Sequence, residues 1–490
     1  MLTKPAQLSR PSHIANEQRF AMQAQTLLIL NIVGLTPRLI GTYTPRLKAF
    51  VEQGRLLPLQ TVTPAVTCTV QASMMTGLPP QQHGIVGNGW LFRDLAEIWF
   101  WRQSNKLITG EKIWEAGKAR DPRFTCANLF WWYNMASSHD YGITPRPIYK
   151  ADGRKLPDCY TTPPEWRDEL SQKLGAFPLF QFWGPATTIK SSRWIADAAK
   201  LAITEKNPTL TMVYLPHLDY DLQRHGPDLA SQAVQQSLRN IDEVAGDLIA
   251  HAQQAGRRVM ILSEYGITAV NRPVHLNRIL REAGYLVVRQ EDGAELLDPI
   301  ASSAYAVADH QFAHVYISRP ELIAPVRRLL AGVAGVEGIW AGSERTEIGL
   351  DHPRSGELVV MADQRSWFTY YYWQDDALAP DFARTVDIHR KPGYDPAELF
   401  VDKNIRFPKL AVAWRLGKRL LGLRSLMNVI GLDASLVKGS HGRPVDDVAD
   451  GPLLILDQAK ADGVNEVHAT DIKDIALKIM FKDAHSGAGK

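Results

Sequence analysis

The chain has 490 residues, of which 45% are hydrophobic and 22% are charged, and this composition is that of an ordinary globular protein. It is long enough for one large elaborated domain or for two to three smaller ones. The 55 basic and 52 acidic residues give a net charge of +3. No long-range electrostatic field therefore indicates a nucleic acid polymer or a membrane surface as partner.

The cysteine count and the N-terminus bear on the cellular compartment. Cys68, Cys126 and Cys159 lack a CxxC pairing and leave an odd thiol in any disulfide scheme, which favours a reducing, cytoplasmic environment. The first 20 residues lack the apolar core and the small-residue cleavage site of a signal peptide. No run reaches the roughly 18 apolar residues that a membrane span needs, so no transmembrane segment is predicted.

Short apolar runs alternate with helical patterns along most of the chain. After a polar lead, residues 1–25, the run TLLILNIVGL ends at Gly34 and predicts a buried strand followed by a turn. Further strands are predicted within 210–219, 258–266 and 355–364, and helices within 193–206 and 229–256. This alternation predicts an α/β fold with a mainly parallel sheet and helices on both faces.

Two stretches interrupt the alternation. Residues 90–190 are rich in Trp, Tyr, Phe and Pro, and we interpret them as an insertion over one end of the sheet, either a satellite core or a cap that lines a substrate site. Residues 275–354 form a second irregular block, interpreted as a lid or subdomain. The α/β core is therefore expected in residues 26–274 and 355–485.

The most specific motif lies in the segment PAVTCTVQASMMTGLPPQQHGI. This segment resembles the nucleophile segment of nucleotide pyrophosphatases/phosphodiesterases and of phosphonoacetate hydrolases, which are members of the alkaline phosphatase superfamily. The resemblance extends over roughly residues 26–270 and 355–485 and implies an alkaline-phosphatase-like fold. The matching positions are Pro64, Thr67, Thr76, Gly77, Pro80, His83, Gly84 and Ile85.

The resemblance implies hydrolysis of a phosphodiester, pyrophosphate or phosphonate bond in a small phosphorylated substrate. In the family, two metal ions, usually zinc, lower the pKa of a threonine hydroxyl and neutralise phosphoryl oxygens, which allows in-line attack. Thr67 falls on the nucleophile position. A threonine at a helix N-terminus is the other interpretation, and it is compatible with that role because a helix N-terminus favours bound phosphate.

The family's metal ligands carry over unevenly. Val33 stands where the first strand of the family has an aspartate, and Asn31, on the same strand face, offers a neutral oxygen in its place. Alignment on the Gly-Pro at 226–227 matches Asp219 to the family's next aspartate and puts Gln223 at the histidine position.

A shifted alignment stays open for this pair of ligands. It uses Asp221 and His225, which keep the Asp-x-x-x-His spacing and would lie on one face of a helix. We prefer Asp219 with Gln223, because the Gly-Pro anchor follows that choice.

The second metal site departs further from the family. Glu264 and Tyr265 replace an Asp-His pair; the glutamate binds a hard cation, and the tyrosine is a donor to a phosphoryl oxygen. His441 matches the family's last histidine. These candidate ligands together predict one metal site with nitrogen and oxygen ligands and a second site with oxygen ligands only. A single ion, or a mixed pair of zinc, magnesium or manganese, is therefore expected.

Two further clusters are candidate substrate contacts. His310 and His314 have the spacing of two ligands on a helix, but their flanks alternate as in strands, which favours an accessory or structural role. His389 and Arg390 lie in a Pro/Gly-bounded loop that either determines the fold or faces an anionic substrate.

Three alternatives remain at this point. Residues 408–427 predict an amphipathic helix with Lys and Arg on one face, either a solvated surface helix or a contact with a lipid-like or polyanionic substrate.

The replaced metal ligands also favour a diverged, non-hydrolytic member of the superfamily that binds a phosphorylated metabolite or a protein partner. Isomerase or transferase chemistry, also found in the superfamily, is disfavoured because those enzymes use a serine or a modified cysteine as nucleophile.

Overall fold

The computed structural model describes residues 24–388, 390–420, 426–457 and 466–481. Its centre is a nine-stranded sheet with the order β23-β2-β22-β11-β1-β10-β5-β6-β9. The strands are β1 (Leu27–Ile32), β2 (Arg55–Gln60), β5 (Cys126–Leu129), β6 (Tyr141–Pro145), β9 (Cys159–Thr162), β10 (Leu210–Leu215), β11 (Arg258–Leu262), β22 (Leu453–Leu456) and β23 (Val467–His468).

The sheet is mainly parallel, as predicted. Strand β1 pairs in parallel with both β10 and β11, and β5 pairs in parallel with β10 and β6. Strands β22 and β9 run antiparallel to their neighbours. Every residue of β1 and β10 is buried, which explains why these strands are continuous apolar runs in the sequence.

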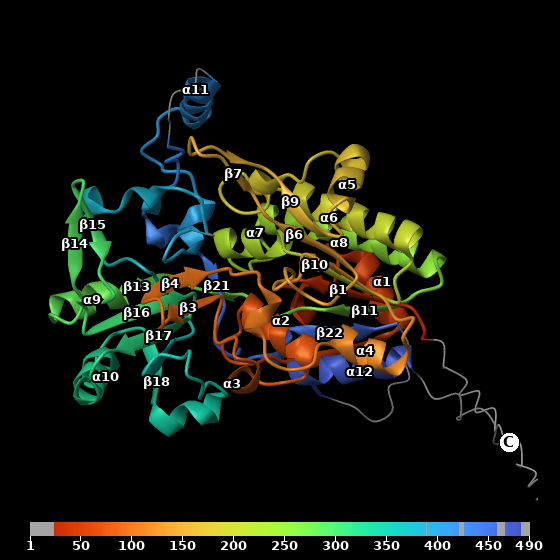
Figure 1. The fold of residues 1–490 in the computed structure, drawn as a ribbon, viewed down its shortest axis with the longest axis horizontal. Helices are drawn as coiled ribbons and strands as arrows, with labels where there is room; N and C mark the ends of the chain where they lie inside the picture. The colour runs from red at the N-terminus through yellow and green to blue at the C-terminus, as the bar shows by residue number, and fades with distance from the viewer. Residues whose placement is uncertain (1–23, 389, 421–425, 458–465, 482–490) are drawn as a thin grey trace, which may run out of the picture.

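Helices cover both faces of the sheet, which confirms the predicted α/β architecture (Figure 1). On one face lie α1 (Pro45–Gln53), α6 (Ile189–Leu201), α7 (His217–His225) and α8 (Gln232–Gln254), with α5 (Trp166–Leu174) beyond them. On the other lie α2 (Thr67–Thr76), α3 (Pro80–His83), α4 (Ile113–Arg120) and α12 (Ile472–Met480).

A second, four-stranded antiparallel sheet lies beside the first (Figure 1). The predicted strand within 355–364 belongs to this sheet as β19 and not to the central one, which corrects the expectation. A short buried run does not reveal in which sheet it pairs. The elements of this lobe are α9 (Leu276–Glu282), β14 (Val288–Glu291), β15 (Ala294–Leu297), β16 (Ala304–Asp309), β17 (Phe312–Ile317), α10 (Ile323–Ala331), β18 (Val336–Ala341) and β19 (Leu358–Ala362).

The aromatic stretch 90–190 is more closely tied to the central sheet than predicted. It supplies strands β5, β6 and β9 to one side of that sheet, in addition to segments that lie over its end. The remaining short elements are β3 (Gly89–Phe92), β4 (Glu97–Phe100), β7 (Ile148–Tyr149), β8 (Lys155–Leu156), β12 (Thr268–Ala269), β13 (Arg272–Val274), β20 (Ser366–Phe368), α11 (Pro408–Leu420) and β21 (Gly439–Ser440).

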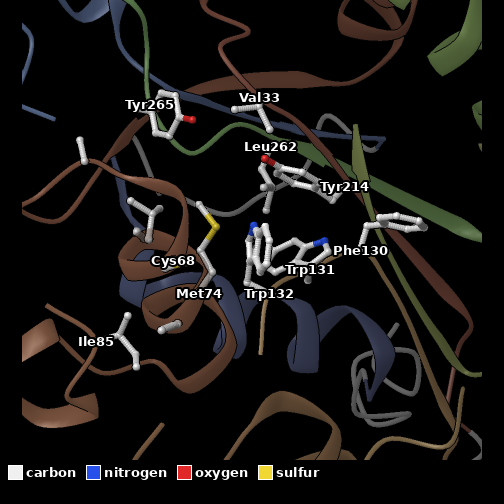
Figure 2. Close-up of a cluster of buried hydrophobic side chains, with 14 of the residues drawn as sticks. Val33, Cys68, Met74, Ile85, Phe130, Trp131, Trp132, Tyr214, Leu262 and Tyr265 are labelled. Carbon is white, nitrogen blue, oxygen red and sulfur yellow. The ribbon is translucent and has the colours of Figure 1, made fainter. Parts of the chain in front are cut away.

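The register of the three central strands brings their carboxyl ends together. Asn31 near the end of β1 lies opposite Tyr214 of β10 and Leu262 of β11. The loops that follow these strands therefore meet at one edge, where ligand sites form in open α/β sheets. Figure 2 shows Tyr214 and Leu262 there, close to Cys68 of α2, in a buried cluster beneath that edge.

Candidate active site

A small, mostly enclosed cavity lies at this edge of the central sheet. Eight of its 15 lining residues are aromatic, and none of the 15 is a lysine or an arginine. The stretch 90–190 contributes four of the aromatic side chains, which supports its interpretation as a lining of the site. The lining residues are Thr67, Asn88, Trp101, Trp132, Phe182, Trp183, Tyr214, Asp219, Tyr220, Gln223, Tyr265, His310, Ile388, Tyr394 and His441.

Thr67 is the first residue of α2, and its hydroxyl meets Tyr265. The two hydroxyl oxygens lie 3.2 Å apart, and Thr67 is 2% exposed. The helix begins here because Val66 is extended and Asn88 Oδ1 accepts a hydrogen bond from the next backbone N–H, that of Cys68, at 2.9 Å. Since Thr67 lines the cavity, the positive end of the α2 dipole faces it.

Asp219 accepts two hydrogen bonds from neighbouring side chains. Tyr265 donates its hydroxyl to Oδ1 at 3.3 Å, and Gln223 donates its amide to Oδ2 at 2.6 Å. Gln223 reaches the carboxylate because it lies one turn further along α7, on the same face. Burial raises the pKa of Asp219 to about 7, although both hydrogen bonds oppose this shift.

His441 stacks on the ring of Tyr265 and lies close to His310. The His441 and Tyr265 ring centroids are 3.7 Å apart with an interplanar angle of 3°, and the His310 ring lies 3.9 Å from that of His441. The Nδ1–H of His441 donates to the carbonyl oxygen of Ala65 at 2.9 Å. Burial lowers the pKa of His441 to about 3 and that of His310 well below its usual value, so both rings are neutral.

Glu264 lies beneath the cavity and is held by two amides. Its Oε1 accepts from Asn31 Nδ2 and from Gln71 Nε2, both at 2.6 Å. The Gln71 amide is oriented for this because its own oxygen accepts the backbone N–H of Trp132 at 2.7 Å. Glu264, Asn31 and Gln71 are fully buried, and none of them lines the cavity.

The carboxyl group of Glu264 is protonated at neutral pH. Burial raises its pKa to about 8, and the hydrogen bonds from Gln71 and Asn31 only partly offset this effect. The second oxygen, Oε2, has no hydrogen-bond partner among the described residues. A proton on that oxygen removes a buried negative charge that nothing else in the site neutralises.

These donors do not fit the predicted metal centre. Among the described residues, no group of three or more His, Cys, Asp or Glu side chains is placed to hold a metal ion. Both oxygens of Asp219 are engaged by protein donors, and Glu264 and Asn31 are sealed below the cavity. Gln223 and Tyr265 stand where the resemblance implies two metal-binding imidazoles, and their amide and hydroxyl hydrogens are donated to Asp219.

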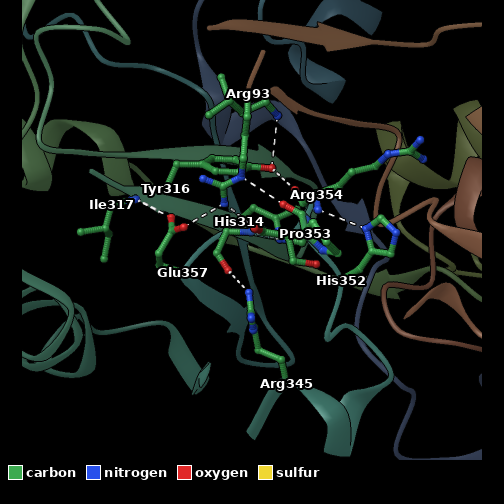
Figure 3. A network of polar contacts seen from close by, with 12 residues as sticks. Arg93, His314, Tyr316, Ile317, Arg345, His352, Pro353, Arg354 and Glu357 are labelled. Carbon is green, nitrogen blue, oxygen red and sulfur yellow. Dashed lines mark hydrogen bonds and ion pairs between the residues drawn. The ribbon is translucent and has the colours of Figure 1, made fainter. Parts of the chain in front are cut away.

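The structure brings some predicted residues to the cavity and leaves others outside it. His225 lies at the exposed end of α7, so the shifted alignment does not place a ligand in the site. His314 is structural: its ring donates to the Val86 carbonyl at 2.9 Å and accepts the Gly356 N–H at 3.1 Å, within the polar network of Figure 3. Arg390 is exposed and lies over the Tyr149 ring at 3.9 Å, and His389 is outside the described residues.

Sequence reasoning missed two polar residues of the site. Asn88 lines the cavity, caps α2 and donates to Asp309 and Tyr394 at 3.2 and 3.1 Å. Gln71, one turn into α2, fixes Glu264. Two sequence features could have indicated them: a polar side chain one helical turn after a candidate nucleophile, and an asparagine between two glycines shortly after the motif.

Residues 27–395 match the family model described as "Type I phosphodiesterase / nucleotide pyrophosphatase". The chain belongs to this family. A curated relative, ectonucleotide pyrophosphatase/phosphodiesterase 2 of Saccharomyces cerevisiae, is 25% identical over 263 residues. That match covers 50% of this chain and 48% of the relative, so the chain spans about half the length of the curated relative it matches.

Solved structures of family members share the fold. Phosphonoacetate hydrolase from Sinorhizobium meliloti 1021, in complex with phosphonoformate, has a TM-score of 0.58 at 15% identity, with 94% of this chain and 96% of that chain covered. Inactive murine ectonucleotide pyrophosphatase/phosphodiesterase 5, in complex with AMP, has a TM-score of 0.56 at 13% identity, with 94% and 95% covered. These likenesses confirm the predicted alkaline-phosphatase-like α/β architecture.

The protonated Glu264 predicts a pH-dependent stability. Its pKa in the folded chain lies above that of the unfolded chain, so the folded state keeps a proton that the unfolded state releases between about pH 4.5 and 8. Stability contributed by this proton is lost as the pH rises through that window. The variant Glu264→Gln imitates the protonated acid and does not titrate. Between pH 5 and 8.5, the Tm of the wild type should therefore fall by about 3–5 °C more than the Tm of the variant.

Differential scanning calorimetry of both proteins across this range measures the effect. Asp219 titrates in both, so its contribution cancels in the difference. Parallel Tm profiles for the two proteins would show that Glu264 is ionised in the folded chain.

Proposed function

We propose that the protein hydrolyses a phosphodiester, pyrophosphate or phosphonate bond of a small phosphorylated substrate, with Thr67 as the nucleophile. The observation that carries this proposal is the chain of hydroxyl contacts from Thr67, at the N-terminus of α2, through Tyr265 to Asp219. Family membership supports the reaction class. The AMP complex of the murine relative supports a small phosphorylated substrate.

The hydroxyl contacts suit a proton relay. Because Tyr265 donates to Asp219, its oxygen is free to accept the hydroxyl hydrogen of Thr67. Movement of one proton along each bond leaves a nucleophilic oxygen on Thr67 and a protonated Asp219. A carboxyl group with a pKa of about 7 is well matched to this role near neutral pH.

The remaining steps balance with the same groups. Attack forms a bond between Thr67 Oγ1 and phosphorus and breaks the bond from phosphorus to the leaving group, which takes the proton from Asp219 through Tyr265. Water then hydrolyses the threonine ester and restores the hydroxyl. The dipole of α2 favours the phosphoryl group, and the neutral Glu264 below it removes a repulsive charge.

The chemistry is proposed without the two metal ions that the resemblance implies, because the donors that face the cavity do not fit them. A cytoplasmic location is part of the proposal and is supported by three free thiols, all buried. Among the described residues, no helix is long and apolar enough to cross a membrane.

A second candidate function is non-hydrolytic binding of a phosphorylated metabolite or another small ligand. It is favoured by the absence of lysine and arginine among the cavity-lining residues, since a metal-free site usually neutralises a phosphoryl group with such side chains. One experiment distinguishes the two functions. If the protein only binds its ligand, the wild type shows no turnover, and replacement of Thr67 leaves the ligand affinity unchanged.

Replacement of Thr67 tests the nucleophile. Turnover of a generic aryl phosphodiester such as bis(p-nitrophenyl) phosphate is expected to fall by at least ~10³-fold in Thr67→Ala, because the ester intermediate cannot form. Thr67→Ser keeps the hydroxyl and is expected to retain activity within about tenfold. An unchanged circular dichroism spectrum and Tm establish that the fold is intact. Equal turnover in wild type and Thr67→Ala excludes the proposed mechanism.

Tyr265→Phe tests the relay separately. The ring that stacks on His441 is kept and only the hydroxyl is lost. We expect kcat to fall by about 10²-fold with KM changed by less than about threefold. In the wild type, kcat/KM should rise as the pH increases through about 7, where Asp219 loses its proton. This rising limb of the pH profile should disappear in the variant. A retained limb would assign the pH dependence to another group.

Removal of divalent metal tests the departure from the family's ligands. Dialysis against EDTA and 1,10-phenanthroline is expected to leave turnover within about twofold and Tm within about 1 °C, because no metal contributes binding energy to the folded state. Elemental analysis by mass spectrometry should find less than about 0.1 ion per chain. The variant Gln223→His/Tyr265→His restores imidazoles near Asp219 and serves as a positive control for zinc uptake. Stoichiometric metal in the wild type would refute the metal-free site.

A further inference from the structure

Helix α11 stands out from the body of the protein (Figure 1). Several apolar side chains on and beside this helix are exposed. Phe407, just before the helix, is 60% exposed, and Leu410 and Trp414 are each 67% exposed. Leu416 adds a further exposed side chain. A surface helix of a globular protein normally turns its apolar side chains toward the core, and Leu410 and Trp414 depart from this pattern.

Another side of the helix contacts the protein through Arg415. Arg415 donates to the side-chain oxygen of Asn428 at 3.0 Å and to its carbonyl oxygen at 3.3 Å. Leu410 and Trp414 are four residues apart and therefore lie on one face, which points away from these contacts. The contacts of Arg415 thus leave Leu410 and Trp414 turned to solvent.

Basic residues accompany these apolar side chains, and acidic ones are absent. Between Lys403 and Leu432 the sequence contains seven Lys or Arg and no Asp or Glu. Lys418 places its Nζ 5.2 Å from the centre of the Trp414 ring. Within the described part of the chain, Lys409 and Lys418 form no ion pair, whereas Lys403 is paired with Asp433 at 2.6 Å.

We propose that residues 406–418 form a docking surface for an anionic lipid membrane. In this arrangement Phe407, Leu410 and Trp414 insert into the acyl boundary, and the Lys409 and Lys418 ammonium groups contact lipid phosphates. An indole ring at the border between apolar and charged groups is suited to that interface. The helix lies in the plane of the surface and anchors the chain peripherally.

The charge pattern argues against a second copy of the chain as the occupant. A symmetric dimer through this face would bring its own basic side chains together without acidic partners, and like charges in contact oppose association. An anionic bilayer supplies both the apolar phase and the negative charge that the face lacks. This inference stands apart from the proposed hydrolysis, because it depends on no residue of the cavity.

Vesicle co-sedimentation with the full chain tests the surface. The protein should bind vesicles of phosphatidylcholine and phosphatidylglycerol at a 3:1 ratio at least ~10-fold more tightly than vesicles of phosphatidylcholine alone, and binding should weaken at least ~10-fold between 50 and 500 mM NaCl. The double variants Leu410→Ser/Trp414→Ser and Lys409→Glu/Lys418→Glu should each bind at least ~10-fold more weakly.

Ile300→Ser is the matched control, because Ile300 is an 82% exposed apolar side chain outside the helix. It should bind anionic vesicles as the wild type does, and all variants should keep the wild-type Tm. Undiminished binding by either double variant, or no preference for anionic vesicles, overturns the proposal. So does a dimer in analytical ultracentrifugation that Leu410→Ser/Trp414→Ser dissociates, because the face would then cover a second copy.

Discussion

Two carboxyl groups buried at the carboxyl ends of β10 and β11 have to be neutralised, and the polar architecture of the site depends on how this happens. Burying a charge without a partner costs far more than one hydrogen bond returns. Asp219 is held by a phenol and an amide, and Glu264 by two amides and its own proton. Donor hydrogens therefore stand where the resemblance implies cations.

This solution couples residues that are far apart in the sequence. The amide of Asn31 on β1 and that of Gln71 on α2 meet on one oxygen of Glu264, which follows β11. Restoring a single metal-binding residue of the family would add a buried charge to this network or remove one of its hydrogen-bond donors. The cation site would still be incomplete. The members of such a network are therefore expected to be non-additive when they are changed singly.

The α/β architecture could be predicted because apolar runs alternate with helical patterns, and Thr67, Asp219 and His441 could be predicted from the resemblance of their segments to the family. The residues after β1, β10 and β11 converge at one edge, and there the structure brings Thr67, Asp219 and His441 together. Partner choice could not be predicted: β19 joined the second sheet although its sequence resembles a central strand. His314 has a ligand-like spacing, but backbone contacts from distant segments bind both of its ring nitrogens.

The aromatic lining changes where binding energy comes from. Without cations or basic side chains on its walls, the cavity offers a phosphoryl group only the end of α2 and neutral hydrogen-bond donors. Under the proposed function, rings such as Trp101 and Trp183 bury the rest of the ligand, and stacked or edge-on aromatic contacts add to that burial. Those rings come from loops of the stretch 90–190, which also supplies strands β5, β6 and β9, so the lining of the cavity is continuous in sequence with the central sheet.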